Sequence, residues 1–422
     1  MAATCLVSIF AAQLLLALAL VVQLARLGLG QASWPRLPPD GAIVAFSVWT
    51  LLSAAFSSDP LDSHDSAKKL VLFVLLYLAV AAMQEAAGRE RAMDAALLGG
   101  LVLASGSVLQ YHLLGFDTIG NRPHSFLGHY MTASGLCMGV LIVAAARLAF
   151  ARDLALPTRR DAGQALLVLL ALAVLAALQA ADLFALEAER LFVAGLAAAA
   201  FALAFRAAAL TTGARSLLAS LALVASAWAL LVSRTRNAWI GAVLGLGVIA
   251  LLRAPKLLWL LAGVIAAVAI IRPRPVMDRL TLDQSSVDRY YMWQAGFDMI
   301  RDKPVFGQGP GRILEAYPAY RWPEAPNALT PHMHNNVVQI AAERGVIGLA
   351  WWIWLVAVLL ADAWRELRRS RDWGAAAALA LLVSVLGAGM FEYNFGDSEV
   401  LMFVLVVAAL PYALRPRERV PA

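Results

Sequence analysis

The chain has 422 residues, of which 61% are hydrophobic and 15% charged, and its mean hydropathy is +0.73. This composition excludes a soluble protein and is typical of a polytopic helical membrane protein. The net charge of +6 does not indicate nucleic-acid binding, because the sequence has no basic patch interleaved with aromatic residues. The two cysteines lie in apolar segments, so they suggest neither a disulfide framework nor a thiolate metal site.

Apolar segments recur along the chain and predict about twelve or thirteen membrane-spanning helices. We therefore expect an all-α polytopic fold: a transmembrane bundle (residues 1–271), a polar catalytic loop with amphipathic helices (272–344) and the last transmembrane helices (345–422). Residues 5–25 lack the basic start and cleavage site of a signal peptide, so we interpret them as a helix. The expected spans are 5–25, 42–57, 69–87, 95–114, 129–151, 164–182, 190–210, 216–233, 237–252, 256–272, 345–362, 373–391 and 399–414.

The short loops alternate between basic and acidic, and this alternation predicts their sides of the membrane because basic loops stay in the cytoplasm. The side of the N-terminus stays open. On this assignment the loop 272–344 faces outward, which in a bacterium with two membranes is the periplasm. The basic set carries Arg89, Arg91, Arg152, Arg159, Arg160, Arg215, Arg253, Lys256, Arg365, Arg368, Arg369, Arg371, Arg415, Arg417 and Arg419, and the acidic set Asp59, Asp62, Asp65, Asp182, Glu187, Glu189, Glu392, Asp397 and Glu399.

Three polar segments on the outer side precede the large loop. Asp62, His64 and Asp65 are residue types that bind a hard or borderline metal, but their spacing matches no metal motif, and a solvated acidic loop explains them as well. Residues 121–130 contain Arg122 and His124 and could line the same cavity as the large loop. Residues 233–239 contain Arg234 and Arg236, which either snorkel at a helix end or bind an anion.

The large loop holds most of the residues able to do chemistry. Between Ser286 and Arg301, apolar residues at three- and four-residue spacing predict an amphipathic helix whose polar face carries Arg289. The glycines and prolines of residues 303–311 predict tight turns. After His332, either Asn335 or Asn336 is expected to cap the next helix, which leaves His334 at a helix N-terminus, where the positive helix end keeps an imidazole neutral and attracts anions.

On these residues the chain resembles the O-antigen ligase family, which shares its core domain with O-antigen polymerases and some protein O-oligosaccharyltransferases. The resemblance covers about residues 120–350. A Ser-Arg-x-x-Trp element is matched by residues 235–239, with Thr235 in place of serine and Arg234 as an additional arginine. Arg-x-x-x-Trp and Pro-x-x-Gly-x-Gly are matched by residues 289–293 and 304–309, and His-Asn-x-x-x-Gln and Glu-x-Gly-x-x-Gly by residues 334–339 and 343–348. Residues 122–129 look more like the outer loop of the ligase branch than that of a polymerase.

The resemblance implies a GT-C-like glycosyltransferase without a cofactor, which transfers a glycan from undecaprenyl diphosphate to a lipid A–core acceptor at the inner membrane. Arg289 and Arg236 are then expected to stabilise the leaving diphosphate, and His334 to act as general base on the acceptor hydroxyl. Arg234, Arg122, His124, Asn335 and His332 are the expected substrate-binding residues.

Several alternatives stay open. A polymerase of the same family would join repeat units, and a protein oligosaccharyltransferase would use Ser or Thr acceptors, although this chain carries no large C-terminal soluble domain. A lipid-linked sugar flippase would share the spans and the arginines but would not need a histidine at a helix start. A metal-dependent mechanism would use Asp62, His64 and Asp65, whereas we expect arginines to supply the positive charge and no metal to bind.

Overall fold

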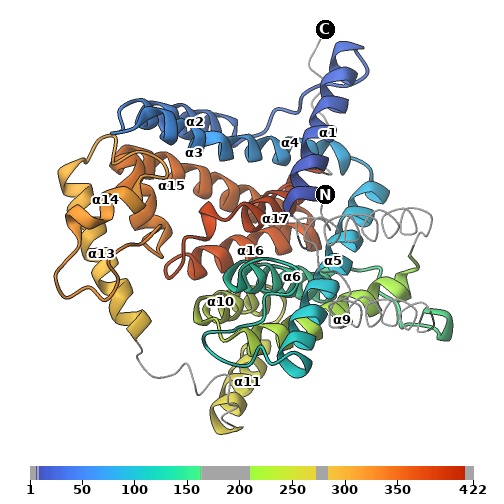
Figure 1. The fold of residues 1–422 in the computed structure, drawn as a ribbon. Helices are drawn as coiled ribbons and strands as arrows, with labels where there is room; N and C mark the ends of the chain where they lie inside the picture. The colour runs from blue at the N-terminus through green and yellow to red at the C-terminus, as the bar shows by residue number, and fades with distance from the viewer. Residues whose placement is uncertain (1–5, 7–8, 162, 164–209, 272–283, 414–422) are drawn as a thin grey trace.

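The computed structural model describes residues 6, 9–161, 163, 210–271 and 284–413, and these residues form helices joined by loops and turns (Figure 1). An all-α polytopic membrane protein is therefore confirmed. The helices are α1 (Ile9–Gly28), α2 (Asp40–Ala55), α3 (Pro60–Ala67), η2 (Lys68–Phe73), α4 (Val74–Ala82), α5 (Ala86–Leu113), α6 (Tyr130–Phe150), α9 (Thr212–Ser233), α10 (Arg236–Arg253), α11 (Leu257–Ile271), α13 (Gln284–Asp302), α14 (Ile313–Tyr320), α15 (Asn336–Ser370), α16 (Trp373–Ala388), η3 (Asn394–Gly396), α17 (Ser398–Ala408) and α18 (Leu410–Ala413).

Six of the described helices are long and apolar enough to cross a membrane: α1, α5, α6, α9, α10 and α15. Four shorter apolar helical segments lie at other predicted spans, namely Asp40–Ala55, Leu257–Ala267, Trp373–Ala388 and Ser398–Ala413. The expected span 69–87 is instead a 3-10 segment followed by the short helix α4, and the next helix, α5, already begins at Ala86. The predicted spans 164–182 and 190–210 lie outside the described residues, apart from Leu210.

The centre of the molecule consists of α15, α16 and α17, with α2 packed against α15 on one side and α6 and α10 against α16 on the other (Figure 1). Glycines permit the close approach of these helices. A side chain at Gly241 of α10 would meet the main-chain oxygen of Ser384 in α16 at 2.7 Å, and the Ser384 hydroxyl donates a hydrogen bond to the carbonyl of Gly241 at 2.7 Å. Small residues thus let the helices pack in the absence of a hydrophobic driving force between them.

We call the end of the bundle where α5 and α16 begin the basic end. There Arg89 pairs with Asp372, Arg147 with Glu90, and Arg215 with Asp94 through its Nε at 2.9 Å. These pairs join α5, α6, α9 and the turn before α16, so Arg89 and Arg215, two members of the basic set, lie at the same end. Arg89 lies in the first turn of α5, so its predicted position in a loop is wrong.

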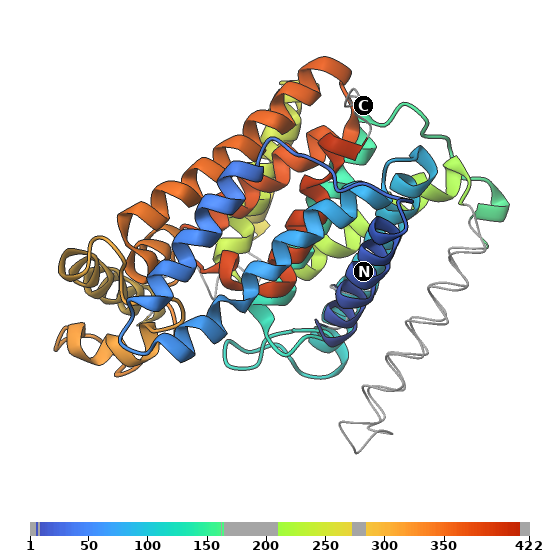
Figure 2. The ribbon, with the colours of Figure 1, turned by 90° about the horizontal axis from the view of Figure 1, so that it is seen from above.

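We call the opposite end, where α15 begins, the loop end. It carries α13, α14 and α3 together with the connections 114–129, 303–312, 321–335 and 389–397. Figure 2 shows α13 and α14 beyond one end of the long helices. Of the acidic outer set, Asp62 and Asp397 lie at this end: Asp62 pairs with Arg312 at 2.8 Å, and the Asp397 carboxylate accepts a hydrogen bond from the Thr132 hydroxyl.

Two glycine-containing motifs interlock at the loop end. Helix α15 is interrupted at Gly345, which has φ of 69° and ψ of 177°. The amide of Val346 donates to the carbonyl of Pro304 at 2.8 Å, and the amides of Gln308 and Gly309 donate to the Ala342 and Glu343 carbonyls at 2.8 and 2.9 Å. A side chain at Gly345 would lie 1.9 Å from the oxygen of Val305, so only glycine fits. The turn 304–309 is thereby fixed against the first part of α15.

Candidate active site

The start of α15 presents His334 in a constrained conformation. Asn335 is the N-cap, and its side chain accepts hydrogen bonds from the amides of Val337 and Val338 at 2.9 and 3.1 Å. His334, one residue earlier, has a φ of 46°, in the left-handed region that costs energy for a residue with a side chain. Such strain at a histidine beside a helix N-terminus is a recognised feature of functional sites. The capping prediction for Asn335 is confirmed.

Two asparagines tie this helix start to the connection between α16 and α17. The Asn335 side-chain amide donates to the Met390 carbonyl at 2.9 Å, and that of Asn336 donates to the side chain of Asn394 at 2.7 Å. The main-chain amide of Asn336 donates to the Gly389 carbonyl at 2.7 Å. These bonds fix the segment 389–394 beside His334.

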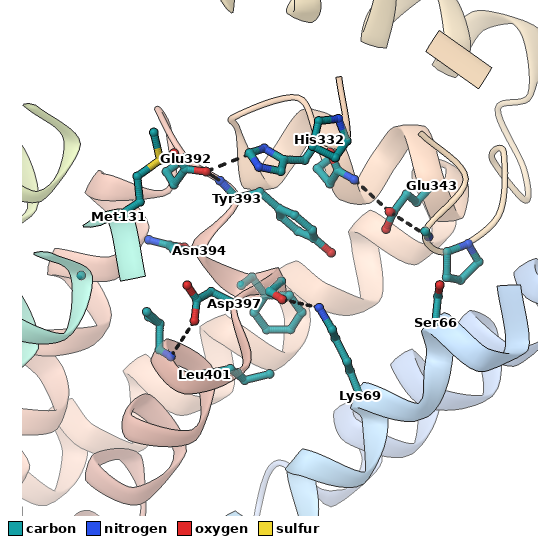
Figure 3. Close-up of a pocket in the computed structure, with 18 of the residues that line it drawn as sticks. Ser66, Lys69, Met131, His332, Glu343, Glu392, Tyr393, Asn394, Asp397 and Leu401 are labelled. Atoms are coloured by element: carbon teal, nitrogen blue, oxygen red, sulfur yellow. Dashed lines mark hydrogen bonds and ion pairs between the residues drawn. The ribbon is translucent and has the colours of Figure 1, made fainter. Parts of the chain in front are cut away.

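That segment places Glu392 beside His334. The Nδ1 atom of His334 lies 2.9 Å from a carboxylate oxygen of Glu392, whose other oxygen lies 3.7 Å from Nδ1 of His332. The rings of His332 and His334 lie at 70° to each other with centroids 4.2 Å apart. Figure 3 shows the His332 ring directed at the Glu392 carboxylate. Among the described residues, these three form a group whose metal-ligating atoms all lie within 4.8 Å of one another.

The charges of these groups follow from their surroundings. Burial would raise the pKa of Glu392, but the hydrogen bond from His334 and the charges of both histidines outweigh it and bring this pKa below its usual value. Burial, followed by the charge of His334, lowers the pKa of His332 to about 4. At neutral pH Glu392 is therefore a carboxylate and His332 a neutral ring. Because a carboxylate can only accept, His334 donates through Nδ1–H, so in the neutral form of its ring the lone pair lies on Nε2.

A cavity of about 450 Å³ adjoins this cluster. His332 and Glu392 line it together with residues from α2, α3, α6, α15 and η3, and Lys69 reaches across it to the carbonyl of Gly396 at 2.6 Å (Figure 3). Glu343, deeper in the wall, accepts hydrogen bonds from the amide of Gly311 at 3.0 Å and from the side chain of Gln339 at 2.8 Å. The cavity is large enough for part of a sugar, and its wall is polar on the side of the histidines.

The helices that carry the two arginines expected to bind phosphate meet near this cluster. Arg289 projects from α13, as the amphipathic pattern predicted, and it is close enough to His332 to contribute to the lowering of its pKa. Arg236 is the first residue of α10 and donates hydrogen bonds to the hydroxyls of Ser285 and Ser286 at 3.2 and 3.0 Å. The start of α10 therefore contacts α13 one turn before Arg289.

Arg122, Arg234 and His124, which were also predicted to bind substrate, lie outside the cavity lining. Arg122 stacks on the Tyr130 ring at 3.4 Å, beside His129, which lines the cavity. Arg234 is buried after α9, 5.9 Å from the Tyr111 ring, with a φ of 55°. His124 packs against Phe116, and its amide donates to Gln110. Of the eight residues expected from the sequence, His332 alone is part of the described cavity lining.

The acidic residues of the rival metal site have other partners. Asp62 pairs with Arg312, Asp65 pairs with Lys68 at 2.8 Å, and the Nδ1 of His64 lies 2.6 Å from the carbonyl of Pro60. All three lie on α3, where they do not converge. A metal mechanism through these three side chains has no support in this arrangement.

Glu392 was not among the site residues predicted from the sequence. It appeared only as a member of the acidic outer set, although one signal was available: the segment Phe391-Glu392-Tyr393-Asn394 places a carboxylate and an amide directly after an apolar helix. Glu343 and Gln339 were noted only as motif positions. In the structure both are buried, and they connect α15 with the turn that follows residue 309.

Comparison with known families gives one finding. The family model described as O-antigen ligase matches residues 221–353, which run from α9 through α13 and the His334 region into α15. Comparison with curated proteins gives no match.

Proposed function

Because the chain belongs to the O-antigen ligase family, we propose that it transfers a glycan from undecaprenyl diphosphate to a lipid A–core oligosaccharide. The observation that carries the proposal is the His334–Glu392 pair at the N-terminus of α15, beside a cavity and close to the arginine-bearing helix α13. The loop end faces the periplasm of the inner membrane, because the basic end carries the positively charged short loops.

His334 acts as general base. The acceptor hydroxyl approaches Nε2 and transfers its proton to that atom while its oxygen bonds to the anomeric carbon of the donor. The bond between that carbon and the diphosphate oxygen breaks, with inversion at the carbon. Glu392 keeps the proton on Nδ1 and stabilises the imidazolium that forms, as the carboxylate does in other histidine–carboxylate pairs.

Arginines receive the leaving group. Undecaprenyl diphosphate gains negative charge as its bond to the sugar breaks, and guanidinium groups stabilise that charge through paired hydrogen bonds without a metal. The contact of Arg236, at the start of α10, with the first turn of α13 supports a shared role for Arg289 and Arg236. Arg122 and Arg234 lie at the same end and assist in binding the donor.

A gene deletion in the parent bacterium tests the proposal. Loss of a ligase leaves the lipid A–core unmodified while lipid-linked polymer accumulates. Loss of a polymerase would leave single repeats on the core, and loss of a flippase would trap the donor on the cytoplasmic face. Gel analysis of lipopolysaccharide together with mass spectrometry of the undecaprenyl lipids separates the three outcomes, and either of the last two would refute the ligase assignment.

A further inference from the structure

The group formed by His332, His334 and Glu392 offers two imidazoles and one carboxylate, the donor set that suits zinc. In a tetrahedral zinc site with metal–ligand bonds of about 2.1 Å, neighbouring ligand atoms lie about 3.4 Å apart. One carboxylate oxygen of Glu392 lies 2.9 Å from Nδ1 of His334 and the other lies 3.7 Å from Nδ1 of His332, distances on either side of that value. Small side-chain rotations would therefore bring all three ligand atoms onto one ion.

Two further observations favour a ligand here. Among the described residues, Nδ1 of His332 is buried and accepts or donates no hydrogen bond, although its partner carboxylate lies nearby. The three residues are also held rigidly, because Asn335 and Asn336 fix the segment 389–394 against the start of α15. A preformed set of ligand atoms with one unsatisfied nitrogen can bind an ion without rearrangement of the backbone.

We propose that His332, His334 and Glu392 form a binding site for a zinc ion that inhibits the enzyme. The inference rests on the proposed role of His334 as base. A zinc ion on Nδ1 of His334 replaces the proton at that atom, so the neutral ring must carry its remaining proton on Nε2. That nitrogen can then no longer accept the proton of the acceptor hydroxyl, and glycan transfer stops. Mg²⁺, which prefers six oxygen ligands, does not occupy the site.

The site is that of a reversible inhibitor rather than a resident cofactor. It provides three protein ligands and leaves the fourth position to water, and Arg289 acts on the same cluster with positive charge. Repulsion between this guanidinium and a dication weakens binding compared with zinc sites that have no neighbouring cation, so the ion exchanges with the solution.

Zinc binding to the purified full-length protein in metal-free detergent tests the proposal. We expect one Zn²⁺ per chain by competition with a chromogenic chelator, at least tenfold weaker binding in His332→Ala and in Glu392→Gln, and no change in His64→Ala, which removes an exposed histidine of α3. X-ray absorption of the wild-type protein with zinc should show two imidazole ligands, a result that does not depend on how the variants fold. Equal zinc affinity in all four proteins, or a spectrum with fewer than two imidazoles, would overturn the site.

Measuring glycan transfer in the presence of zinc tests the zinc site and the proposed function separately. Zn²⁺ should abolish glycan transfer over the concentration range in which it binds, EDTA should restore it, and Mg²⁺ should have no effect. Zinc that binds these residues without inhibiting transfer would uphold the site and overturn the role of His334 as base. Absence of zinc binding, in a protein that the His334→Ala change inactivates, would overturn the zinc site and leave the proposed function standing.

Discussion

The two ends of the bundle both bury ionisable side chains, but they combine them differently. At the basic end carboxylates pair with arginines, as Glu90 does with the fully buried Arg147. At the loop end the buried Glu343 pairs with Arg344 in the same way, but Glu392 pairs with His334. A guanidinium keeps its proton at any relevant pH, whereas an imidazole exchanges its proton near neutrality. The first kind of pair can therefore only hold helices together, while the second can also move a proton.

The largest effect is expected from Arg147→Ala. The change leaves the carboxylates of Glu90 and Asp94 with less positive charge in a buried region and also removes the contact of Arg147 with the Trp373 ring. Breaking a buried ion pair from one side costs about 3–5 kcal/mol, so little folded protein should be recovered. Fluorescence-detected size exclusion of the detergent-solubilised protein measures this. Arg91→Ala, an exposed arginine that bonds only within α5, is the control and should be recovered normally.

His334→Ala should show the opposite pattern, namely normal insertion and folding with transfer lowered about 10²- to 10⁴-fold, the usual contribution of a general base. Arg289→Ala should be similarly inactive because the leaving diphosphate loses its stabilising charge. Turnover of lipid-linked donor and lipid A–core by the purified variants checks both, with His64→Ala as the matched control. Wild-type amounts of capped lipopolysaccharide in either variant would refute its role.

Glu392→Gln should lower kcat about 10- to 100-fold, because a neutral amide neither fixes the Nδ1 proton nor stabilises the imidazolium. The KM for the donor should stay within about twofold, since the diphosphate is bound elsewhere. Glu392→Asp, which keeps the charge, should recover part of the lost rate. If the residue were only structural, Glu392→Gln and Glu392→Asp would instead lower the yield of folded protein together and leave kcat unchanged.

A smaller effect is expected on acidification. The pKa of His332 in the folded protein is about 4, below the ordinary 6.5, since burial and the charges of His334, His129 and Arg289 together outweigh the attraction of Glu392. Between these values the unfolded chain binds a proton that the folded chain does not, so the free energy of unfolding falls as pH falls. From pH 7 to 5 the unfolding temperature should drop about 1–3 °C less in His332→Gln than in the wild-type protein. Equal drops in both would contradict this account.

The smallest effect is expected from chelation. Transfer by the purified enzyme should be unchanged in excess EDTA, and Asp62→Ala or Asp65→Ala should alter it less than about twofold, because their exposed ion pairs contribute only about 0–1 kcal/mol. Turnover with and without chelator measures this. Loss of activity on chelation that Mg²⁺ or Mn²⁺ restores would mean that a metal, and not the arginines, stabilises the leaving group.

Local features of the site could be predicted from the sequence. The amphipathic helix around Arg289 and the cap at Asn335 depend on spacing and side-chain chemistry within a few residues, and both are present. The pairing of His334 with Glu392 could not be predicted in this way, because they lie 58 positions apart in the sequence and the packing of two helices, α15 and α16, decides where the later segment lies. The same holds for the cavity, whose walls come from parts of the chain between residues 46 and 401.

The all-α membrane fold could be predicted from the sequence, but several helix boundaries could not. Hydropathy identifies apolar segments, yet it does not detect ion pairs that let charged residues continue a helix. The expected spans 69–87 and 95–114 leave Arg89, Glu90 and Asp94 between two helices. In the structure these residues pair with α6, α9 and the turn before α16, and α5 begins at Ala86. The expected boundary between residues 344 and 345 falls inside α15, at the interruption that Gly345 makes.

The interlock at Gly345 has a consequence for recombining this protein with its relatives. Since the amide of Val346 bonds to Pro304, and Gln308 and Gly309 bond to residues 342 and 343, the first part of α15 shares its backbone hydrogen bonds with the preceding turn. A chimera that exchanged only a loop ending before α15 would combine the turn 304–309 of one protein with the first part of α15 of another. Residues 303–346 and 389–397 share the hydrogen bonds of the interlock and of the His334 region, so both segments should be exchanged together.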